Sequence, residues 1–244
     1  MVKSVILAAG KGTRMKSDKP KVVHQVMGKP MVYYSIEAAR QAGADEVCVI
    51  VGYKADEVKS AIAASVNDVK VDYALQEEQL GTGHAVKCAA DFIGRDGDVI
   101  ILCGDTPLVT GDTLRKALDF HKESGNGVTV ISAMLDDPFG YGRIIRDGGS
   151  LAKIVEQKDA DEAEQAVKEV NSGMYIFDCA ALQDALSQIS NDNAQGEYYL
   201  PDAIEIIKKM GLPASAVPMD DADQIRGVNT LEQLADAEKI MENR

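Results

Sequence analysis

Short apolar runs alternate along this chain with longer segments in which apolar residues recur every three or four positions. The runs predict strands at residues 2–8, 47–51, 69–75, 99–103, 128–134 and 174–177. The periodic segments predict helices at residues 31–41, 55–64, 84–92, 113–121, 181–189, 204–210 and 231–241. Strands that alternate with helices favour a Rossmann-like, doubly wound α/β fold with a mostly parallel sheet.

One segment departs from this alternation. Gly148 and Gly149 separate two short apolar pairs, at residues 144–145 and 154–155. Paired glycines between strand-like segments are typical of a hairpin turn, because glycine adopts positive φ without strain. We therefore expect an antiparallel element inserted after the first half of the sheet. Since no repeat or linker divides the sequence, we expect one domain over residues 1–229, followed by a terminal helix over 230–244.

The connection after the first strand gives the strongest indication of function. The sequence from Leu7 to Lys21 is rich in glycine, and about 20 residues separate the strand from the next helical signal, where about 2 to 6 are usual. Gly10 and Gly12 allow sharp turns that expose backbone N–H groups. Against Asp18 alone, the basic residues of this stretch are Lys11, Arg14, Lys16, Lys19, Lys21 and Lys29. A phosphate-bearing ligand fits this loop, and the alternative is a solvated lysine-rich loop.

The charge of the whole chain narrows the class of ligand. The formal net charge is -13, so most of the surface repels nucleic acid and anionic membranes, and a local basic loop suits a small polyanion. Two common phosphate-binding motifs do not fit. A dinucleotide fingerprint requires a third glycine where Met15 stands, and the Gly-Lys-Ser/Thr order of a Walker A loop is missing. An oxidoreductase and a P-loop ATPase are therefore disfavoured.

Composition indicates an ordinary globular protein. Of the 244 residues 45% are hydrophobic and 27% charged, which suits one large α/β core or two small domains. The sequence contains neither an apolar stretch of membrane-spanning length nor a signal-peptide core, so we expect a cytoplasmic protein. The cysteines lack metal-type spacing and are expected to be reduced core residues. They are Cys48, Cys88, Cys103 and Cys179.

Polar residues that follow predicted strands are candidates for binding, because ligands of doubly wound sheets lie beyond the carboxyl ends of the strands. Asp105 follows the strand at 99–103 and is a candidate Mg²⁺ ligand. An aspartate that stabilises its own turn is an equally good interpretation. Gln76 follows the strand at 69–75, and its amide can both donate and accept, as reading a nucleobase edge requires.

Two further residues are better explained as helix caps on local sequence alone. Thr82, in the segment Gly81 to His84, stands where a helix is predicted to begin. Asn229 with Glu232 three positions later has the spacing of a capping box. For both, a structural role at the N-terminus of a helix is favoured over ligand binding.

Several stretches taken together resemble a known family. The sequence Leu7-Ala8-Ala9-Gly10-x-Gly12-Thr13-Arg14-Met15, followed by Pro20-Lys21, resembles the signature of sugar-nucleotide pyrophosphorylases. A narrower resemblance is to the N-acetylglucosamine-1-phosphate uridylyltransferase domains of bacterial bifunctional enzymes. It is carried by residues 78–85, 104–108, 136–144, 154–160 and 193–199, and it extends from residue 5 to about residue 229.

The resemblance implies a Mg²⁺-dependent reaction of UTP with N-acetylglucosamine 1-phosphate that gives UDP-N-acetylglucosamine, a cell-wall precursor, and pyrophosphate. It implies that Arg14 and Lys21 are catalytic and neutralise the phosphates. The implied substrate-binding residues are Leu7, Ala8, Ala9, Gly10, Lys21, Gln76, Gly81, Thr82, Cys103, Gly104, Asp105, Gly142, Glu156, Asn171 and Asn229. Asp105 and Asn229 are implied to hold Mg²⁺, which replaces the capping interpretation of Asn229.

The bifunctional proteins continue into a left-handed β-helix that carries acetyl transfer and the trimer contacts, and this sequence has no hexapeptide period. We therefore expect a monomer without acetyltransferase activity and without nucleic-acid or membrane partners. Three alternatives stay open. They are a cytidylyl- or thymidylyltransferase that uses another sugar phosphate such as glucose 1-phosphate, a catalytically silent sugar-nucleotide-binding module, and a dinucleotide-dependent oxidoreductase.

Overall fold

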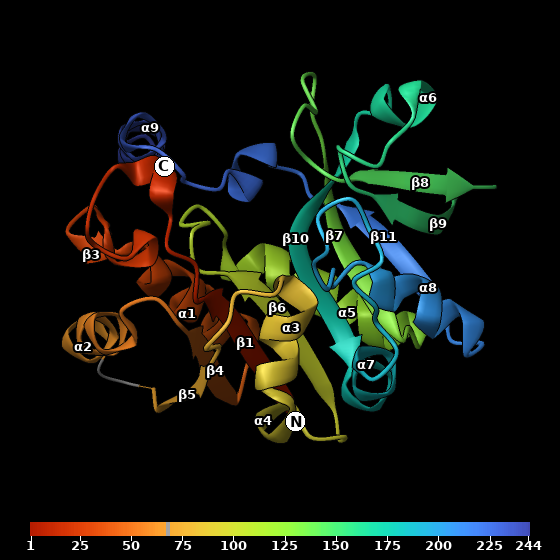
Figure 1. The fold of residues 1–244 in the computed structure, drawn as a ribbon, viewed down its shortest axis with the longest axis horizontal. Coiled ribbons are helices and arrows are strands. Elements are labelled where there is room, and N and C mark those ends of the chain that lie inside the picture. The colour runs from red at the N-terminus through yellow and green to blue at the C-terminus, as the bar shows by residue number, and fades with distance from the viewer. Residues whose placement is uncertain (67–68) are drawn as a thin grey trace.

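A nine-stranded sheet forms the centre of the protein, in a computed structural model that describes residues 1–66 and 69–244. Its main path has the order β11-β7-β10-β6-β1-β4-β5 (Figure 1). These strands are β1 (Val2–Ala8), β4 (Glu46–Val51), β5 (Val71–Leu75), β6 (Asp98–Cys103), β7 (Val128–Met134), β10 (Glu169–Asp178) and β11 (Ala214–Pro218). Only β10 runs antiparallel to its neighbours on this path, among the described residues. The predicted doubly wound, mostly parallel α/β fold is confirmed.

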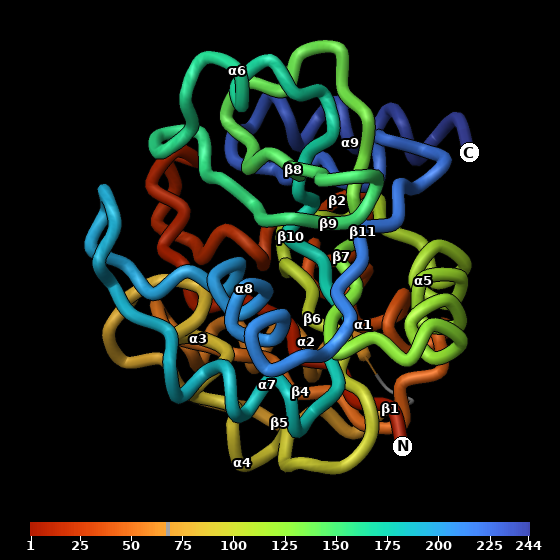
Figure 2. Tube along the Cα trace, turned by 90° about the vertical axis from the view of Figure 1, so that its right-hand side faces the viewer, coloured from red at the N-terminus to blue at the C-terminus, as the bar shows by residue number. Residues whose placement is uncertain are grey.

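Helices cover both faces of the sheet because its central strands are apolar on both sides. In β6, Ile100 and Leu102 pack on one face, and Val99 and Ile101 pack on the other. The first face is covered by α1 (Met31–Ala42), α2 (Ala55–Ser65) and α5 (Gly111–Ser124). The second is covered by α3 (Thr82–Cys88), α4 (Ala90–Ile93), α7 (Cys179–Leu186) and α8 (Asp202–Lys209). Figure 2 shows α5 on one side of the strands and α3 and α8 on the other.

The predicted hairpin is confirmed as β8 (Arg143–Asp147) and β9 (Ser150–Val155). Gly148 and Gly149 form its turn with φ of 55° and 87°, which glycine adopts without strain. The hairpin joins the main sheet where Arg143 pairs with Val170 of β10. It is followed by the short helix α6 (Glu162–Gln165). Hairpin and α6 form a lobe beyond one edge of the sheet, at the upper right of Figure 1.

The long basic connection is anchored to the protein rather than fully solvated. It contains the 3-10 turns η1 (Thr13–Met15) and η2 (Lys21–Val23) and the paired strands β2 (Gln25–Val26) and β3 (Lys29–Pro30). Met15 and Val22 are buried within it. The last helix, α9 (Leu231–Glu242), packs through Ala237 in a cluster with Val26 and Leu108. This arrangement places α9 against the segment of β2 and β3, opposite the hairpin lobe, whereas the N-terminus lies away from both, at the start of β1 (Figure 1).

Several boundaries differ from the prediction for physical reasons. The helix expected at residues 84–92 begins at Thr82 and is interrupted at Ala89, and α7 ends at Leu186 rather than at 189. β10 is longer than expected because polar residues interrupt its apolar run, and β11 was missed because its sequence is short and weakly apolar. The strand expected at residues 69–75 begins at Val71, and residues 67–68 lie outside the described chain.

The cysteines are free, as expected, but only two of them are core residues. Cys48 and Cys179 are buried, whereas Cys88 and Cys103 are half-buried. The prediction that all four lie in the core is therefore wrong for Cys88 and Cys103. Among the helices of the described residues, none has both the length and the apolar character that a membrane span requires.

Candidate active site

The first group of candidate residues lies where β1 and β6 end side by side. The backbone N–H of Gly104 donates to the carbonyl oxygen of Leu7 at 2.9 Å, which joins the two strand ends. Ala8 and Ala9 are buried, and Gly10 is exposed. Gly10 does not adopt positive φ, and a Cβ at this position would meet open space. The fold therefore does not require glycine at position 10, and the expected exposure of its backbone N–H to a ligand stays a prediction.

Gly12 does have the expected conformation, and it positions Lys21. Its φ is 67°, and a Cβ there would collide with the Cβ of Lys21. Beyond the end of β6, Lys21 forms an ion pair with Asp105 and donates to Asn229 Oδ1 at 2.9 Å. Arg14 donates to the same Oδ1, also at 2.9 Å. The fold thus brings together four predicted residues from the basic loop, the end of β6 and the segment before α9.

These contacts test whether Asp105 and Asn229 suit a metal ion. One oxygen from each side chain faces the same ammonium nitrogen, Lys21 Nζ, so the two oxygens already converge on a positive charge. Carboxylate and amide oxygens suit Mg²⁺, which is commonly held by one or two carboxylates together with substrate phosphates. No group of three or more His, Cys, Asp or Glu side chains suited to a metal occurs in residues 1–66 and 69–244. The residues therefore fit a metal that shares its coordination with a substrate.

The alternative role of Asp105 in its own turn is not observed. That turn is closed by Thr106, whose hydroxyl donates to the Cys103 carbonyl oxygen at 2.9 Å, while the Asp105 carboxylate faces Lys21. The capping box predicted at Asn229 is wrong by one residue. Thr230 is the N-cap of α9, and its Oγ1 accepts from the N–H of Gln233 at 3.2 Å. The Asn229 side chain is therefore left for Lys21 and Arg14.

A second group of candidates lies at the ends of β4 and β5. Gln76 is 4% exposed, and its N–H donates to the Val51 carbonyl oxygen at 2.8 Å. A Cβ at Gly52 would lie 2.9 Å from the carbonyl oxygens of both Ala9 and Gln76. Glycine at position 52 thus lets these two segments approach each other. The Gln76 side-chain amide donates to the Gly81 carbonyl oxygen at 3.2 Å.

The predicted N-cap role of Thr82 is wrong. Gly81 is the N-cap of α3, no side chain caps this helix, and Thr82 is its first residue. Thr82 Oγ1 instead accepts from the N–H of Leu200 at 3.0 Å, so its hydroxyl ties α3 to the segment before α8.

A third group of candidates lines a cavity of about 240 Å³ between the sheet and the hairpin lobe. Gly142 and Glu156 flank the hairpin, and a Cβ at Gly142 would lie 3.1 Å from Glu156 Oε1 and 3.5 Å from Asn171 Cβ. Asn171 Nδ2 donates to the Tyr175 hydroxyl at 2.6 Å. Six predicted residues line this cavity: Leu7, Thr82, Cys103, Gly142, Glu156 and Asn171.

Burial sets the charge properties of this cavity. Burial raises the pKa of the Glu156 carboxyl. The negative charges of Asp159 and Asp202 raise this pKa further, whereas the positive charge of Arg143 lowers it. Burial also raises the pKa of the Cys103 thiol to about 12. A thiol with such a pKa is protonated near neutral pH and is not a nucleophile.

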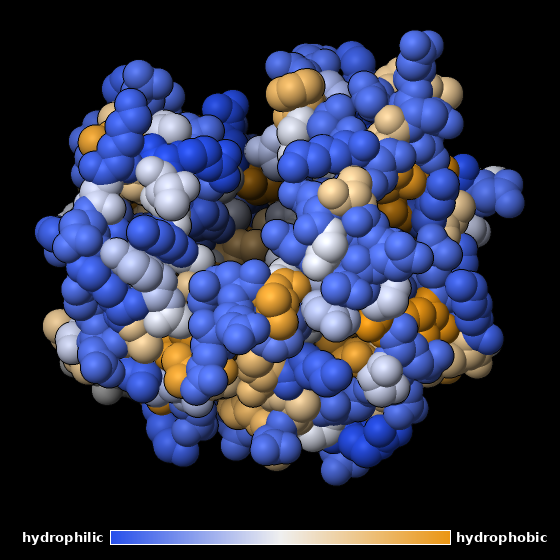
Figure 3. Space-filling model, in the orientation of Figure 1, coloured by the Kyte–Doolittle hydropathy of each residue, from blue (hydrophilic) through white to orange (hydrophobic). Residues whose placement is uncertain are grey.

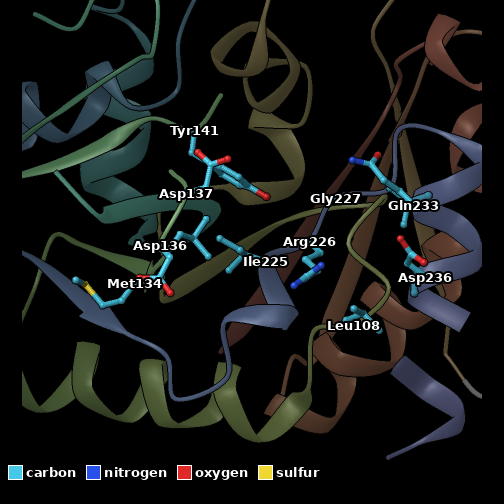
Figure 4. A pocket seen from close by; sticks show the side chains of 13 residues that line it. Leu108, Met134, Asp136, Asp137, Tyr141, Ile225, Arg226, Gly227, Gln233 and Asp236 are labelled. Atoms are coloured by element: carbon cyan, nitrogen blue, oxygen red, sulfur yellow. The ribbon is translucent and has the colours of Figure 1, made fainter. Parts of the chain in front are cut away.

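A larger cavity of about 650 Å³ lies between the hairpin lobe and α9. Figure 3 shows the molecule hollowed between these two parts. In Figure 4, Tyr141 and Asp137 face Gln233 and Asp236 across this space. Tyr141 lines both cavities, and Gly227 in the larger one is two residues before Asn229. A Cβ at Gly227 would lie 3.8 Å from Asp105 Oδ2, so the larger cavity approaches the charged cluster, and Cys103 of the smaller cavity is two residues before Asp105.

The sequence analysis missed several residues that shape the site. Tyr175 supports Asn171, Gly52 allows the approach of Ala9 to Gln76, and Tyr141 separates the two cavities. A signal existed for Tyr141, since it lies in one of the stretches that carry the family resemblance. Neither Gly52 nor Tyr175 has a local pattern, because their roles depend on contacts with distant segments.

Comparisons with known proteins place these residues in a family. A family model described as nucleotidyl transferase matches residues 3–237. Bifunctional protein GlmU of Caldanaerobacter subterraneus subsp. tengcongensis is 55% identical over 99% of this chain and 52% of its own length. The protein of the same name from Thermoanaerobacter pseudethanolicus is 52% identical, with the same coverage of both chains. The chain thus spans about half the length of the curated relatives it matches.

A solved structure shows the same fold at lower identity. It is described as a glucose-1-phosphate thymidylyltransferase from Bacillus anthracis in complex with sucrose, and it matches with a TM-score of 0.80 at 20% identity. The match covers 100% of this chain and 96% of that one. Together with the family match over residues 3–237, the shared architecture confirms the predicted kind of family: this chain belongs to the nucleotidyl transferase family.

Proposed function

We propose that this chain catalyses the reaction of UTP with N-acetylglucosamine 1-phosphate to give UDP-N-acetylglucosamine and pyrophosphate. The observation that carries the proposal is the convergence of Lys21, Asp105 and Asn229 just past the end of β6, where Cys103 lines the cavity that contains Glu156 and Asn171. The residues proposed for phosphate chemistry would then lie next to the residues proposed for sugar recognition. Relatives named Bifunctional protein GlmU that are 47–55% identical support this choice of substrates.

Transfer in this site proceeds without a protein nucleophile. An oxygen of the sugar phosphate attacks the α-phosphorus of UTP in line, the bond to the leaving oxygen breaks, and pyrophosphate departs with its electron pair. Lys21 and Arg14, which meet at Asn229, hold the two anions close and offset their repulsion. Cys103 is protonated, which is consistent with direct transfer.

Asp105 and Asn229 are proposed to hold Mg²⁺ together with the substrate phosphates. Bound there, the metal supplies a Lewis acid that lowers the negative charge of the phosphates. Lys21 contacts both oxygen ligands in this structure. We propose that Lys21 leaves these oxygens when the metal binds and then contacts the phosphates.

Sugar binding is proposed for Gly142, Glu156 and Asn171. Glu156 is half-buried, and its carboxylate accepts no hydrogen bond from the described residues, so it is available to sugar hydroxyls. Asn171 is held by Tyr175, and its amide can both donate to and accept from the sugar amide. On the nucleotide side, the backbone from Leu7 to Gly10 is proposed to contact UTP, Cys103 and Gly104 line the same edge, and Gln76, Gly81 and Thr82 face the base.

Pyrophosphate release over a grid of nucleotides and sugar phosphates tests the proposal. UTP with N-acetylglucosamine 1-phosphate is expected to exceed CTP and glucose 1-phosphate by at least on the order of tenfold in kcat/KM, because a site built to hydrogen-bond a group rejects analogues that lack it. The second candidate, thymidylyl transfer to glucose 1-phosphate, shares the fold of the Bacillus anthracis protein. Equal or higher rates with dTTP and glucose 1-phosphate would favour that candidate.

A further inference from the structure

The side chain of Gln76 is held by two neighbours that leave one of its ends free. Its Nε2 lies 3.2 Å from the Gly81 carbonyl oxygen and 3.2 Å from His84 Nδ1. The carbonyl oxygen can only accept, so the atom that faces it is the amide nitrogen. The two N–H groups of the amide are then divided between Gly81 and His84. Within residues 1–66 and 69–244, no hydrogen bond is made to Gln76 Oε1.

This arrangement fixes the chemistry of His84 as well. Because the second N–H of Gln76 points at it, His84 Nδ1 acts as an acceptor and carries a lone pair. A side chain without an acceptor at this place would leave one amide N–H unpaired. The Gly81 carbonyl oxygen alone would then oppose the flipped amide, in which nitrogen instead of oxygen faces the ligand, and the observed orientation would be held less strongly.

The backbone around this pair is held in place by the segment before α8. Tyr198 N–H donates to the Leu80 carbonyl oxygen at 2.9 Å, and Gly83 N–H donates to the Tyr198 carbonyl oxygen at 2.7 Å. Gly81 has φ of 107°, and a Cβ there would lie 2.6 Å from the Tyr198 carbonyl oxygen. Gln76 is itself anchored through its backbone at the end of β5. The frame is therefore rigid, and the amide orientation is held locally by the Gly81 carbonyl oxygen and His84 together.

From this geometry we propose that His84 is a positioning residue for nucleobase recognition, which keeps Gln76 Oε1 directed at the base. The inference rests on the proposed function for the identity of the ligand. An oxygen in this position accepts from the ring N–H of uracil, whereas the matching ring nitrogen of cytosine carries a lone pair and is repelled. His84 thus acts on the choice between UTP and CTP through Gln76, without contacting the nucleotide.

Calorimetric titration with UTP and with CTP, without any sugar phosphate, tests this inference. His84→Leu removes the acceptor and is expected to lower the preference for UTP over CTP by on the order of tenfold, the scale of one hydrogen bond. His84→Asn can place its amide oxygen near the position of Nδ1, and it is expected to restore most of the preference. Lys87→Ala, on the exposed side of the same helix, is the matched control and should bind like the wild type.

The outcomes separate this role from a structural one. A folded His84→Leu protein with an unchanged preference would overturn the proposal, and so would a His84→Asn protein that loses the preference as fully as His84→Leu. Melting temperatures establish that each variant is folded. Wild-type protein that prefers UTP in titration but releases no pyrophosphate with N-acetylglucosamine 1-phosphate would contradict the proposed function alone, because the binding preference does not depend on turnover.

Discussion

Strand β6 has an aspartate at each end, and the two make a matched comparison. Asp98 begins the strand and lies 3.5 Å from His121 Nε2, while Asp105 follows its end and pairs with Lys21. Both aspartate side chains are 20% exposed. The two carboxylates are equally exposed, and each faces a nitrogen atom of a basic side chain. The residues that surround His121 and Lys21, however, differ.

At the amino end, the partner is part of a closed network. His121 is 2% exposed, and its Nδ1 lies 2.9 Å from the hydroxyl of Thr129, which also accepts from Asn126 at 2.9 Å. Each polar group there is satisfied by a neighbour. At the carboxyl end, Lys21 comes from a half-exposed loop and shares Asn229 with the exposed Arg14.

The comparison teaches that exposure and pairing do not identify a functional carboxylate. What distinguishes Asp105 is the number of positive groups that meet around one edge of the sheet, where loops from distant parts of the chain converge. Such an excess of charge can be balanced by an anionic ligand. The hydrogen bonds around Asp98 are complete without a ligand, and they contribute to the stability of the fold.

The largest expected effect is on turnover at the carboxyl end. Asp105→Asn should reduce pyrophosphate release by at least about a hundredfold, because the charge it removes acts where phosphate charge is neutralised. Its melting temperature should stay close to that of the wild type, since a partly exposed ion pair contributes little stability. Asn229→Asp, which keeps an oxygen ligand, should retain appreciable activity. A fully active Asp105→Asn protein would remove Asp105 from the site.

The second prediction concerns the amino end of β6, where we expect a loss of stability without a loss of activity. Asp98→Asn should lower the free energy of unfolding by about 2 kcal/mol, the scale of a hydrogen bond to a charged group, with unchanged turnover per folded molecule. Denaturant titration combined with the pyrophosphate assay measures both quantities. A large loss of activity without a loss of stability would show that the two ends of β6 are not separate in function.

This stability should also depend on pH in a defined direction. The hydrogen bond to His121 lowers the pKa of Asp98 below its ordinary value of 3.8, although burial opposes the shift. Since the folded pKa lies below the unfolded one, the contribution is present above pH 3.8 and is lost as the pH falls through the folded value. The difference in unfolding free energy between wild type and Asp98→Asn should therefore shrink below about pH 4.

The third prediction uses the metal alone as a probe of the carboxyl end. Lys21→Met frees the oxygens of Asp105 and Asn229, so Mn²⁺ should bind about tenfold more tightly in the absence of nucleotide. Lys19→Met, an exposed lysine of the same loop, is the control and should not change Mn²⁺ binding. Calorimetric titration measures both. Equal affinities in the wild type and Lys21→Met would contradict the idea that Lys21 stands in the metal position.

The smallest predicted effect distinguishes the helix-capping role of Thr230 from the proposed metal-binding role of Asn229. Thr230→Ala should cost about 1 kcal/mol of stability because it removes the N-cap of α9, and activity per folded molecule should stay unchanged. Asn229→Ala should show the opposite behaviour, with nearly normal thermal melting and a large loss of Mg²⁺-dependent turnover. Loss of stability alone in Asn229→Ala would restore the capping role.

The sequence was sufficient to predict the sheet, most helices and the hairpin, because these depend on periodicity and on glycine pairs that are local. It failed for β11, whose place beside β7 depends on a parallel crossover rather than on its own residues. Candidate residues next to strand ends could be identified in the same way. The choice between Asn229 and Thr230 as N-cap could not, because both types cap helices well and only the three-dimensional contacts of Lys21 separate them.

The hairpin lobe bears on how this fold can diversify. In the described residues, the strand pairing of β8 with the main sheet is limited to Arg143–Val170, and Arg146 adds an ion pair with Glu169 of β10. The turn end of the hairpin beyond Arg146 can therefore lengthen, shorten or change sequence while β6, β1 and β4 keep their register. Gly142 and Glu156 stand at the two roots of this hairpin. Under the proposed function, selection for a new sugar can act on the roots of the hairpin and on the neighbouring Asn171 of β10, while descendants inherit the residues that handle phosphates unchanged.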